Sequence, residues 1–125
     1  MRFFLLLGLL AMFAPLAQAQ TWVNQRMTVQ VPAGHLHGSL LLPKTDAPLP
    51  VALLIAGSDP TDRDGNNPLG HNDSLKRLAQ ALAKRGIASV RYDKRGVGQS
   101  QPVAPDESQL KVEDYVDDAV AWSRL

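Results

Sequence analysis

Residues 51–67 read VALLIAGSDPTDRDGNN and join an unbroken apolar run, Val51 to Ala56, to a loop rich in Asp, Gly and Asn. An apolar run of this length without alternation predicts a strand covered on both faces, as in a parallel sheet flanked by helices. Loops at the carboxyl ends of parallel strands are where such sheets bind ligands. The stretch therefore predicts an α/β fold whose functional site includes the loop after residue 56.

The segments on either side complete a β-β-β-α-β-α order. Residues 25–31 alternate apolar and polar side chains, and residues 35–43 follow after a Pro-Ala-Gly break, so the two predict an antiparallel hairpin. Residues 72–86 predict an amphipathic helix with Leu75, Leu78 and Leu82 on its apolar face, and residues 87–93 predict a fourth strand. We expect a mostly parallel sheet flanked by helices.

A second helix is predicted over residues 111–125. Its apolar stripe, the face that a βα unit packs against the sheet, comprises Val112, Tyr115, Val116, Ala119 and Val120. A βα unit normally leads to another parallel strand, and none follows this helix in the chain. We therefore expect the fold to lack the strands that would come after it.

The first 19 residues have the pattern of a cleaved secretory signal. Arg2 precedes an apolar run from Phe3 to Phe13, and the small-x-small motif at residues 17–19 predicts a cut after Ala19. The mature domain would then be residues 20–125, periplasmic or secreted, with no membrane attachment after cleavage. We make no prediction of its oligomeric state.

Composition excludes several classes of partner and cofactor. The 125 residues contain no cysteine, so no disulfide is expected in the exported protein. A net charge of +1 without a basic stripe argues against a nucleic-acid partner. His35 and His37 share one side of a strand, but no third ligand accompanies them, so no metal is expected there.

The acidic loop fits a calcium site poorly. If Asp62, Asp64 and Gly65 are read as positions 3, 5 and 6 of an EF-hand loop, Pro60 and His71 fall at positions 1 and 12. Both of those positions need an oxygen ligand, and the last needs a bidentate carboxylate. We expect no metal in this loop.

Two further motifs are incomplete. Gly96 and Gly98 begin a dinucleotide-binding pattern but lack its third glycine, so no nucleotide cofactor is expected. Gly98-Gln99-Ser100 begins the G-x-S-x-G turn of a serine nucleophile, but Pro102 stands where a small residue is required and no helix begins there. Ser100 is therefore a poor candidate nucleophile.

Four segments together resemble the N-terminal half of an α/β-hydrolase: residues 36–43 (LHGSLLLP), 51–67, 78–100 (LAQALAKRGIASVRYDKRGVGQS) and 113–122 (EDYVDDAVAW). The similarity runs from about Thr28 to Leu125 and is nearest to secreted esterases and to dienelactone-hydrolase or S9-peptidase-like enzymes. It implies a small-molecule ester substrate, or less favourably a peptide, attacked by a serine.

The resemblance also implies roles for two loops. Gly57 and Ser58 match the family's oxyanion-hole loop, with the Ser58 N–H as the donor to the charge that develops on the reacting carbonyl. Asp59 stands where this subgroup commonly has Gly, and its carboxylate would oppose an oxyanion unless it points away. The residues expected to brace these loops are Asp62, Arg63, Asp64, Asp93, Arg95, Gly96 and Gly98. A merely solvated loop is the alternative for these bracing residues.

In that family the nucleophile, the acid and the histidine all follow the point that Leu125 reaches. The sequence therefore predicts an N-terminal fragment of a secreted serine hydrolase that is inactive alone. The alternative is a small secreted, non-catalytic binding or structural module that reuses the front of the fold.

Overall fold

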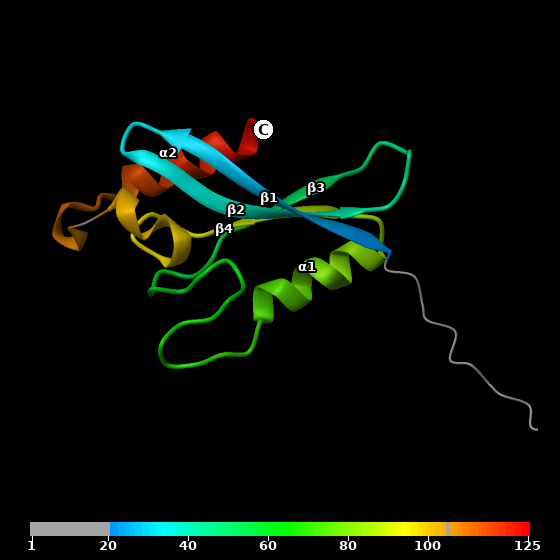
Figure 1. The fold of residues 1–125 in the computed structure, drawn as a ribbon, viewed down its shortest axis with the longest axis horizontal. Coiled ribbons are helices and arrows are strands. Elements are labelled where there is room, and N and C mark those ends of the chain that lie inside the picture. The colour runs from blue at the N-terminus through cyan, green and yellow to red at the C-terminus, as the bar shows by residue number, and fades with distance from the viewer. Residues whose placement is uncertain (1–20, 105) are drawn as a thin grey trace, which may run out of the picture.

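The structure is a computed structural model that describes residues 21–104 and 106–125 (Figure 1). The predicted signal segment lies outside the described residues. The elements are β1 (Trp22–Val31), β2 (Gly34–Pro43), β3 (Val51–Leu54), α1 (Ser74–Lys84), β4 (Ala88–Tyr92), the 3₁₀ turns η1 (Gly98–Val103) and η2 (Glu107–Gln109), and α2 (Val112–Ser123). The predicted β-β-β-α-β-α order is confirmed.

The four strands form one sheet in the order β1-β2-β4-β3. β1 pairs with β2 and β2 with β4 in antiparallel registers, whereas β3 and β4 are parallel. The sheet of the described residues is thus mixed rather than mostly parallel. Only the β3–α1–β4 segment contains the crossover that a parallel pair requires, while the two-residue turn after β1 imposes antiparallel pairing.

β3 differs from its predicted form. It is four residues long and lies at the edge of the sheet, with β4 as its partner. Val51 is 62% exposed and Ile55, just beyond the strand, is 54% exposed. The apolar run predicted burial on both faces, but within residues 21–104 and 106–125 no strand lies on the far side of β3.

Figure 1 shows the two helices on opposite faces of the sheet. On one face, α1 buries Ala79 and Ala83 against Leu41 of β2. Leu78, which was predicted on the apolar face, is exposed instead, so the buried face of α1 is centred on the two alanines. Gly86, with φ of 79°, takes the left-handed position that ends α1 as predicted.

On the other face, α2 presents a side that the sequence did not predict. Trp122 is buried and stacks on Tyr92 of β4 with ring centroids 5.1 Å apart. Gly38 of β2 leaves room for this indole, because a Cβ there would lie 2.6 Å from it. The valines of the predicted stripe turn outward, with Val112 75% and Val116 54% exposed, whereas Tyr115 and Ala119 are half-buried.

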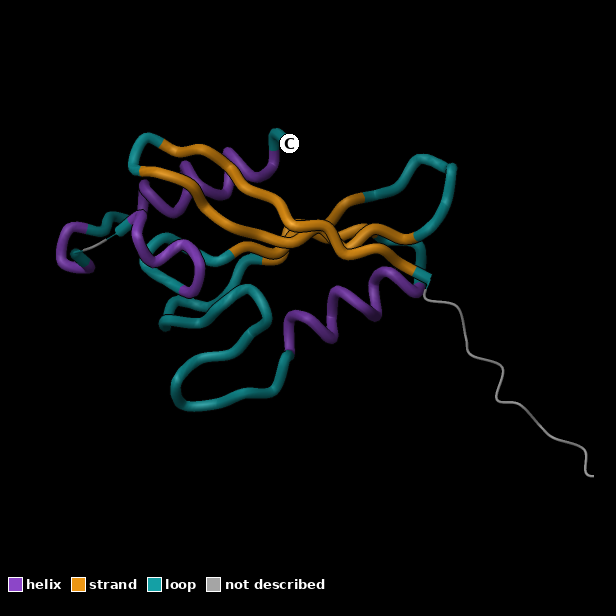
Figure 2. Tube along the Cα trace, in the orientation of Figure 1, coloured by secondary structure: helices purple, strands orange, loops and turns teal. Residues whose placement is uncertain are grey.

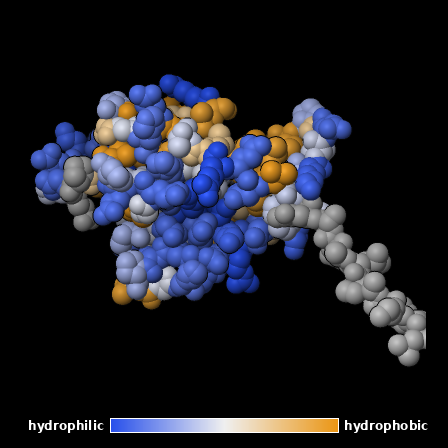
Figure 3. All heavy atoms as spheres, in the orientation of Figure 1, coloured by the Kyte–Doolittle hydropathy of each residue, from blue (hydrophilic) through white to orange (hydrophobic). Residues whose placement is uncertain are grey.

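The space-filling view agrees with this distribution. In Figure 3 hydrophobic atoms gather over the strands and near the C-terminal end, whereas the lower part of the view, over the loop that precedes α1, is mainly hydrophilic. No helix in the described ranges is both long and apolar enough to span a lipid bilayer.

Candidate active-site loop

Two loops meet at one edge of the sheet because β3 and β4 are parallel. The first, residues 55–73, leaves β3 and runs as a long segment below the sheet into α1 (Figure 2). The second begins at Asp93, directly after β4. Parallel strands bring their carboxyl ends together, so Gly57 and Ser58 lie beside the segment that starts at residue 93.

Lys94 joins the two loops. Its side chain is buried, and Nζ donates hydrogen bonds to the carbonyl oxygens of Gly57 and Asp59, the latter at 2.8 Å. Burial lowers the pKa of Lys94, while the nearby charge of Asp59 acts in the opposite direction. The exposed Asp59 carboxylate therefore balances a buried ammonium group. No sequence motif marks Lys94, since its partners are main-chain carbonyls.

The backbone around Ser58 is open. Among residues 21–104 and 106–125, none accepts a hydrogen bond from the Ser58 N–H. A Cβ built on Gly57 would meet no atom within 4 Å. Ser58 borders a cavity of about 380 Å³ with an apolar lining that includes Tyr92, Val112 and Tyr115. This opening can take a small apolar group beside a free backbone donor.

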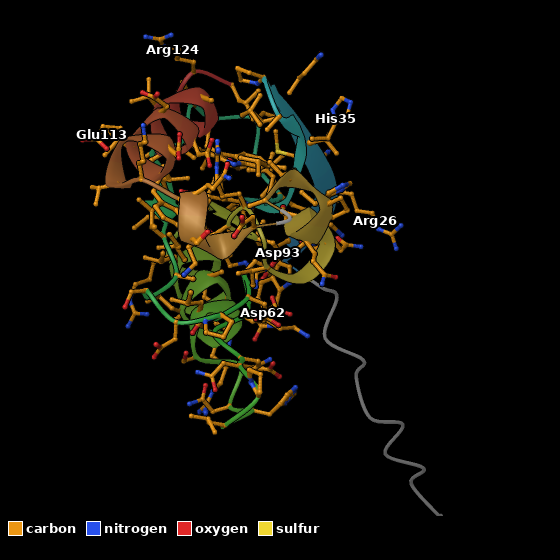
Figure 4. All side chains as sticks on the ribbon, turned by 90° about the vertical axis from the view of Figure 1, so that its left-hand side faces the viewer. Arg26, His35, Asp62, Asp93, Glu113 and Arg124 are labelled. Atoms are coloured by element: carbon orange, nitrogen blue, oxygen red, sulfur yellow. The ribbon has the colours of Figure 1, made fainter. Side chains whose placement is uncertain are left out.

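Asp93 is the centre of the bracing contacts. Its Oδ1 accepts from the Arg63 N–H at 2.8 Å, and its Oδ2 accepts from Arg63 Nη2 at 3.1 Å and from the Gln99 N–H at 3.0 Å. Arg63 Nη1 also donates to the Ser39 hydroxyl of β2 at 3.0 Å. Figure 4 shows Asp93 inside the molecule and Asp62 in the loop below it. One buried carboxylate thus ties both loops to the sheet.

Gly98 fits against this carboxylate. Its φ is 51°, and a Cβ there would lie 2.6 Å from Asp93 Oδ2. Gly96 is also left-handed, with φ of 79°. Any L side chain at position 98 would be strained by the backbone and would push the Asp93 carboxylate away from its donors.

Asp62 accepts hydrogen bonds from the backbone of its own loop, and Asp64 forms an ion pair with an arginine of β4. Asp62 Oδ1 accepts from the N–H groups of Asp64 and Asn66 at 2.9 and 3.0 Å, which closes the turn. Asp64 Oδ1 pairs with Arg91 Nη1 at 2.7 Å, and the Asp64 carbonyl accepts from Leu75 N–H at 3.0 Å at the start of α1. Burial lowers the pKa of Arg91, and Asp64 partly opposes that shift.

The Arg95 side chain binds α2. Its Nε and Nη2 donate to the two carboxylate oxygens of Asp118 at 2.7 and 2.6 Å. Asp118 is 1% exposed, and Asp114 adds a longer contact of 3.8 Å. The bond to Asp118 raises the pKa of Arg95. Arg95 therefore anchors a helix, and its partner Asp118 was not among the predicted site residues.

The remaining polar candidates do not form a site. Ser100 is fully buried, and its hydroxyl accepts from the His37 N–H at 2.9 Å, so it supports β2. His35 projects from the hairpin into solvent (Figure 4). Across the described ranges, no group of three His, Cys, Asp or Glu side chains is placed to hold a metal ion.

The sheet order and the helices on both faces match part of an α/β-hydrolase fold, and comparison with known proteins supports this assignment. No family model matches the chain. Over 60 residues it is 38% identical to Esterase EstD of Thermotoga maritima, a match that covers 48% of this chain and 14% of that protein.

Two solved structures show the same fold. The acylaminoacyl peptidase of Pyrococcus horikoshii aligns with a TM-score of 0.58 at 19% identity, over 85% of this chain and 16% of that one. An α/β serine hydrolase homologue from Coxiella burnetii aligns with a TM-score of 0.50 at 24% identity, over 78% and 44%. The chain thus shares the α/β-hydrolase fold over most of its length and covers well under two thirds of each of these proteins.

Proposed function

We propose that this chain is the N-terminal part of a secreted serine hydrolase that cleaves carboxylic esters, with peptides as less favoured substrates. Gly57 and Ser58 form half of its oxyanion hole, and the Ser58 N–H binds the charge that develops on the carbonyl oxygen. The residues that carry the nucleophile, the acid and the base belong to a longer polypeptide, so residues 20–125 alone do not catalyse the reaction. The signal at residues 1–19 directs the protein out of the cytoplasm.

One observation carries the assignment of the loop. The Ser58 N–H has no acceptor among the described residues, and it lies in a loop whose flanking carbonyls are both held by Lys94. A preorganised backbone donor at the carboxyl edge of a parallel pair is the arrangement that an oxyanion hole requires. The stretch of identity to an esterase supports ester hydrolysis as the reaction.

The surface supports the fragment part of the proposal. The outer edge of β3 is apolar and unpaired within the described residues, and the Val112 and Val116 face of α2 is exposed. Exposed apolar strand edges favour aggregation, so folded proteins normally cover them. A further strand beside β3 and a further helix beside α2 would bury both surfaces. If the chain were instead a small, complete binding or structural module, both apolar surfaces would remain exposed to water.

The oxyanion role is tested in the longer hydrolase with two substitutions at one position. Ser58→Ala keeps the N–H and should retain the activity on a p-nitrophenyl ester. Ser58→Pro removes the N–H, and we expect kcat to fall by about 10²–10³-fold, as when one oxyanion donor is lost elsewhere. Replacing the Ser58 amide by an ester linkage deletes the same N–H without constraining φ and should give the same loss. Equal activity of all variants would refute the assignment.

A further inference from the structure

We infer that Lys94 is a positioning residue that sets the orientation of the Gly57–Ser58 peptide group and so aims the Ser58 N–H. The inference rests on the proposed function of that N–H, whereas the hydrogen bonds of Lys94 are observed independently of any function. Lys94 is 6% exposed, and both of its hydrogen bonds from Nζ go to carbonyls of this one loop. It follows Asp93, whose carboxylate is fixed by Arg63 and the Gln99 N–H, so the lysine backbone is itself anchored.

The geometry follows from the planar trans peptide. The carbonyl of Gly57 and the N–H of Ser58 belong to the same peptide group, and in the trans form they point in opposite directions. Lys94 Nζ holds the carbonyl, so the N–H must point away from the ammonium group. No other hydrogen bond among the described residues holds the Gly57 carbonyl or the Ser58 N–H, and glycine at position 57 permits the plane to rotate once the Lys94 bond is removed.

The second hydrogen bond of Lys94 leaves the Ser58 N–H as the donor that the loop presents. Lys94 also holds the carbonyl of Asp59, which belongs to the Asp59–Pro60 peptide group. Proline has no N–H, so this second anchor fixes the loop without presenting a competing donor. A positive charge on the Gly57 carbonyl also polarises the peptide group, which strengthens its N–H as a donor.

If Lys94 had a purely structural role, its substitution would change a different part of the protein. If Lys94 only tied the loop to the end of β4, removing its charge would loosen the whole edge of the sheet. If it orients the peptide groups that it binds, the change is confined to residues 57–60. The orientation of a single N–H bond separates the two roles, and it can be read from its residual dipolar coupling in weakly aligned, ¹⁵N-labelled protein.

The test compares the chain with its Lys94→Met variant, and Lys84→Met, on the exposed end of α1, serves as the matched control. We expect the Ser58 N–H coupling to fall toward zero in Lys94→Met, while the couplings of residues 88–92 stay as they were. Lys84→Met should change neither. If Lys94→Met does not fold, the milder Lys94→Gln variant is read in the same way.

An unchanged Ser58 coupling in a folded Lys94 variant would overturn the inference. So would loss of the β4 couplings in both Lys94 variants, because Lys94 would then serve the whole fold. Neither result depends on catalysis. If the coupling follows Lys94 but the longer hydrolase has no esterase activity, the proposed function alone is refuted. If the longer hydrolase is active but the coupling is unaffected, this inference alone is refuted.

Discussion

Breaking the buried ion pair between Arg95 and Asp118 should strongly destabilise this chain. Asp118→Asn keeps the size of the side chain but removes its charge and one of the two acceptor oxygens that Arg95 uses, so Asp114 at 3.8 Å is the remaining ion-pair partner of Arg95 among the described residues. Breaking a buried pair costs about 3–5 kcal/mol. The Arg95 side chain is 12% exposed and retains Asp114, so we expect a loss of about 3 kcal/mol, at the lower end of this range.

Urea unfolding followed by circular dichroism measures this loss as a lower midpoint with an unchanged slope. Asp117→Asn is the matched control, since Asp117 is its exposed neighbour on the same helix, and it should stay within about 0.5 kcal/mol of the original chain. If Asp118→Asn is unfolded in buffer, adding an excluded osmolyte raises the free energy of unfolding of both proteins into a measurable range. A loss below about 0.5 kcal/mol for Asp118→Asn would refute the argument that this pair fixes α2.

Three further predictions concern other parts of the chain. Gly98→Ala should lower the free energy of unfolding by about 1–3 kcal/mol because of its left-handed backbone and the Asp93 carboxylate, whereas Gly70→Ala, with open space around its Cβ, should cost under about 0.5 kcal/mol; equal losses in urea titrations would contradict this. Burial first, and the Asp118 charge second, raise the pKa of Tyr92 from 10.0 to about 12. The folded state therefore favours the neutral phenol. This preference stabilises the fold by at most about 2–3 kcal/mol; the stabilisation is complete below about pH 10 and is lost as the pH rises toward 12. If the unfolding midpoints of the original chain and of Tyr92→Phe differ by the same amount at every pH from 9 to 12, the pKa shift is absent. Val116→Lys should leave the unfolding free energy within about 0.5 kcal/mol and reduce self-association in sedimentation velocity, because this valine is exposed; a loss of several kcal/mol would mean that the predicted stripe packs on the sheet after all.

The sequence was informative where local patterns decide the structure. The hairpin of β1 and β2, the glycine that ends α1 at position 86, and the order of the elements all follow from periodicity and turn residues. The apolar run at residues 51–56 predicted the β3–α1–β4 unit correctly. It misjudged the burial of β3, because the second face of a strand depends on neighbours that the run itself does not specify.

The rotation of α2 could not be predicted from hydrophobicity. The valines favoured one inward face, but the helix turns so that Asp118 meets Arg95 and Trp122 meets Gly38 and Tyr92. Each of these contacts joins residues far apart in the chain, and a charged residue on a helix is normally expected outside. Lys94 was missed for a related reason: its partners are carbonyls, which every residue carries.

The central claim is tested most directly by a fluorophosphonate probe that labels activated serines, applied to the native gene product from the cells that make it. The modified serine is then mapped by peptide mass spectrometry. The account predicts one labelled serine, outside residues 1–125, and no labelling of residues 20–125 expressed alone. Absence of labelling in the native product, or modification of Ser58 or Ser100, would contradict it.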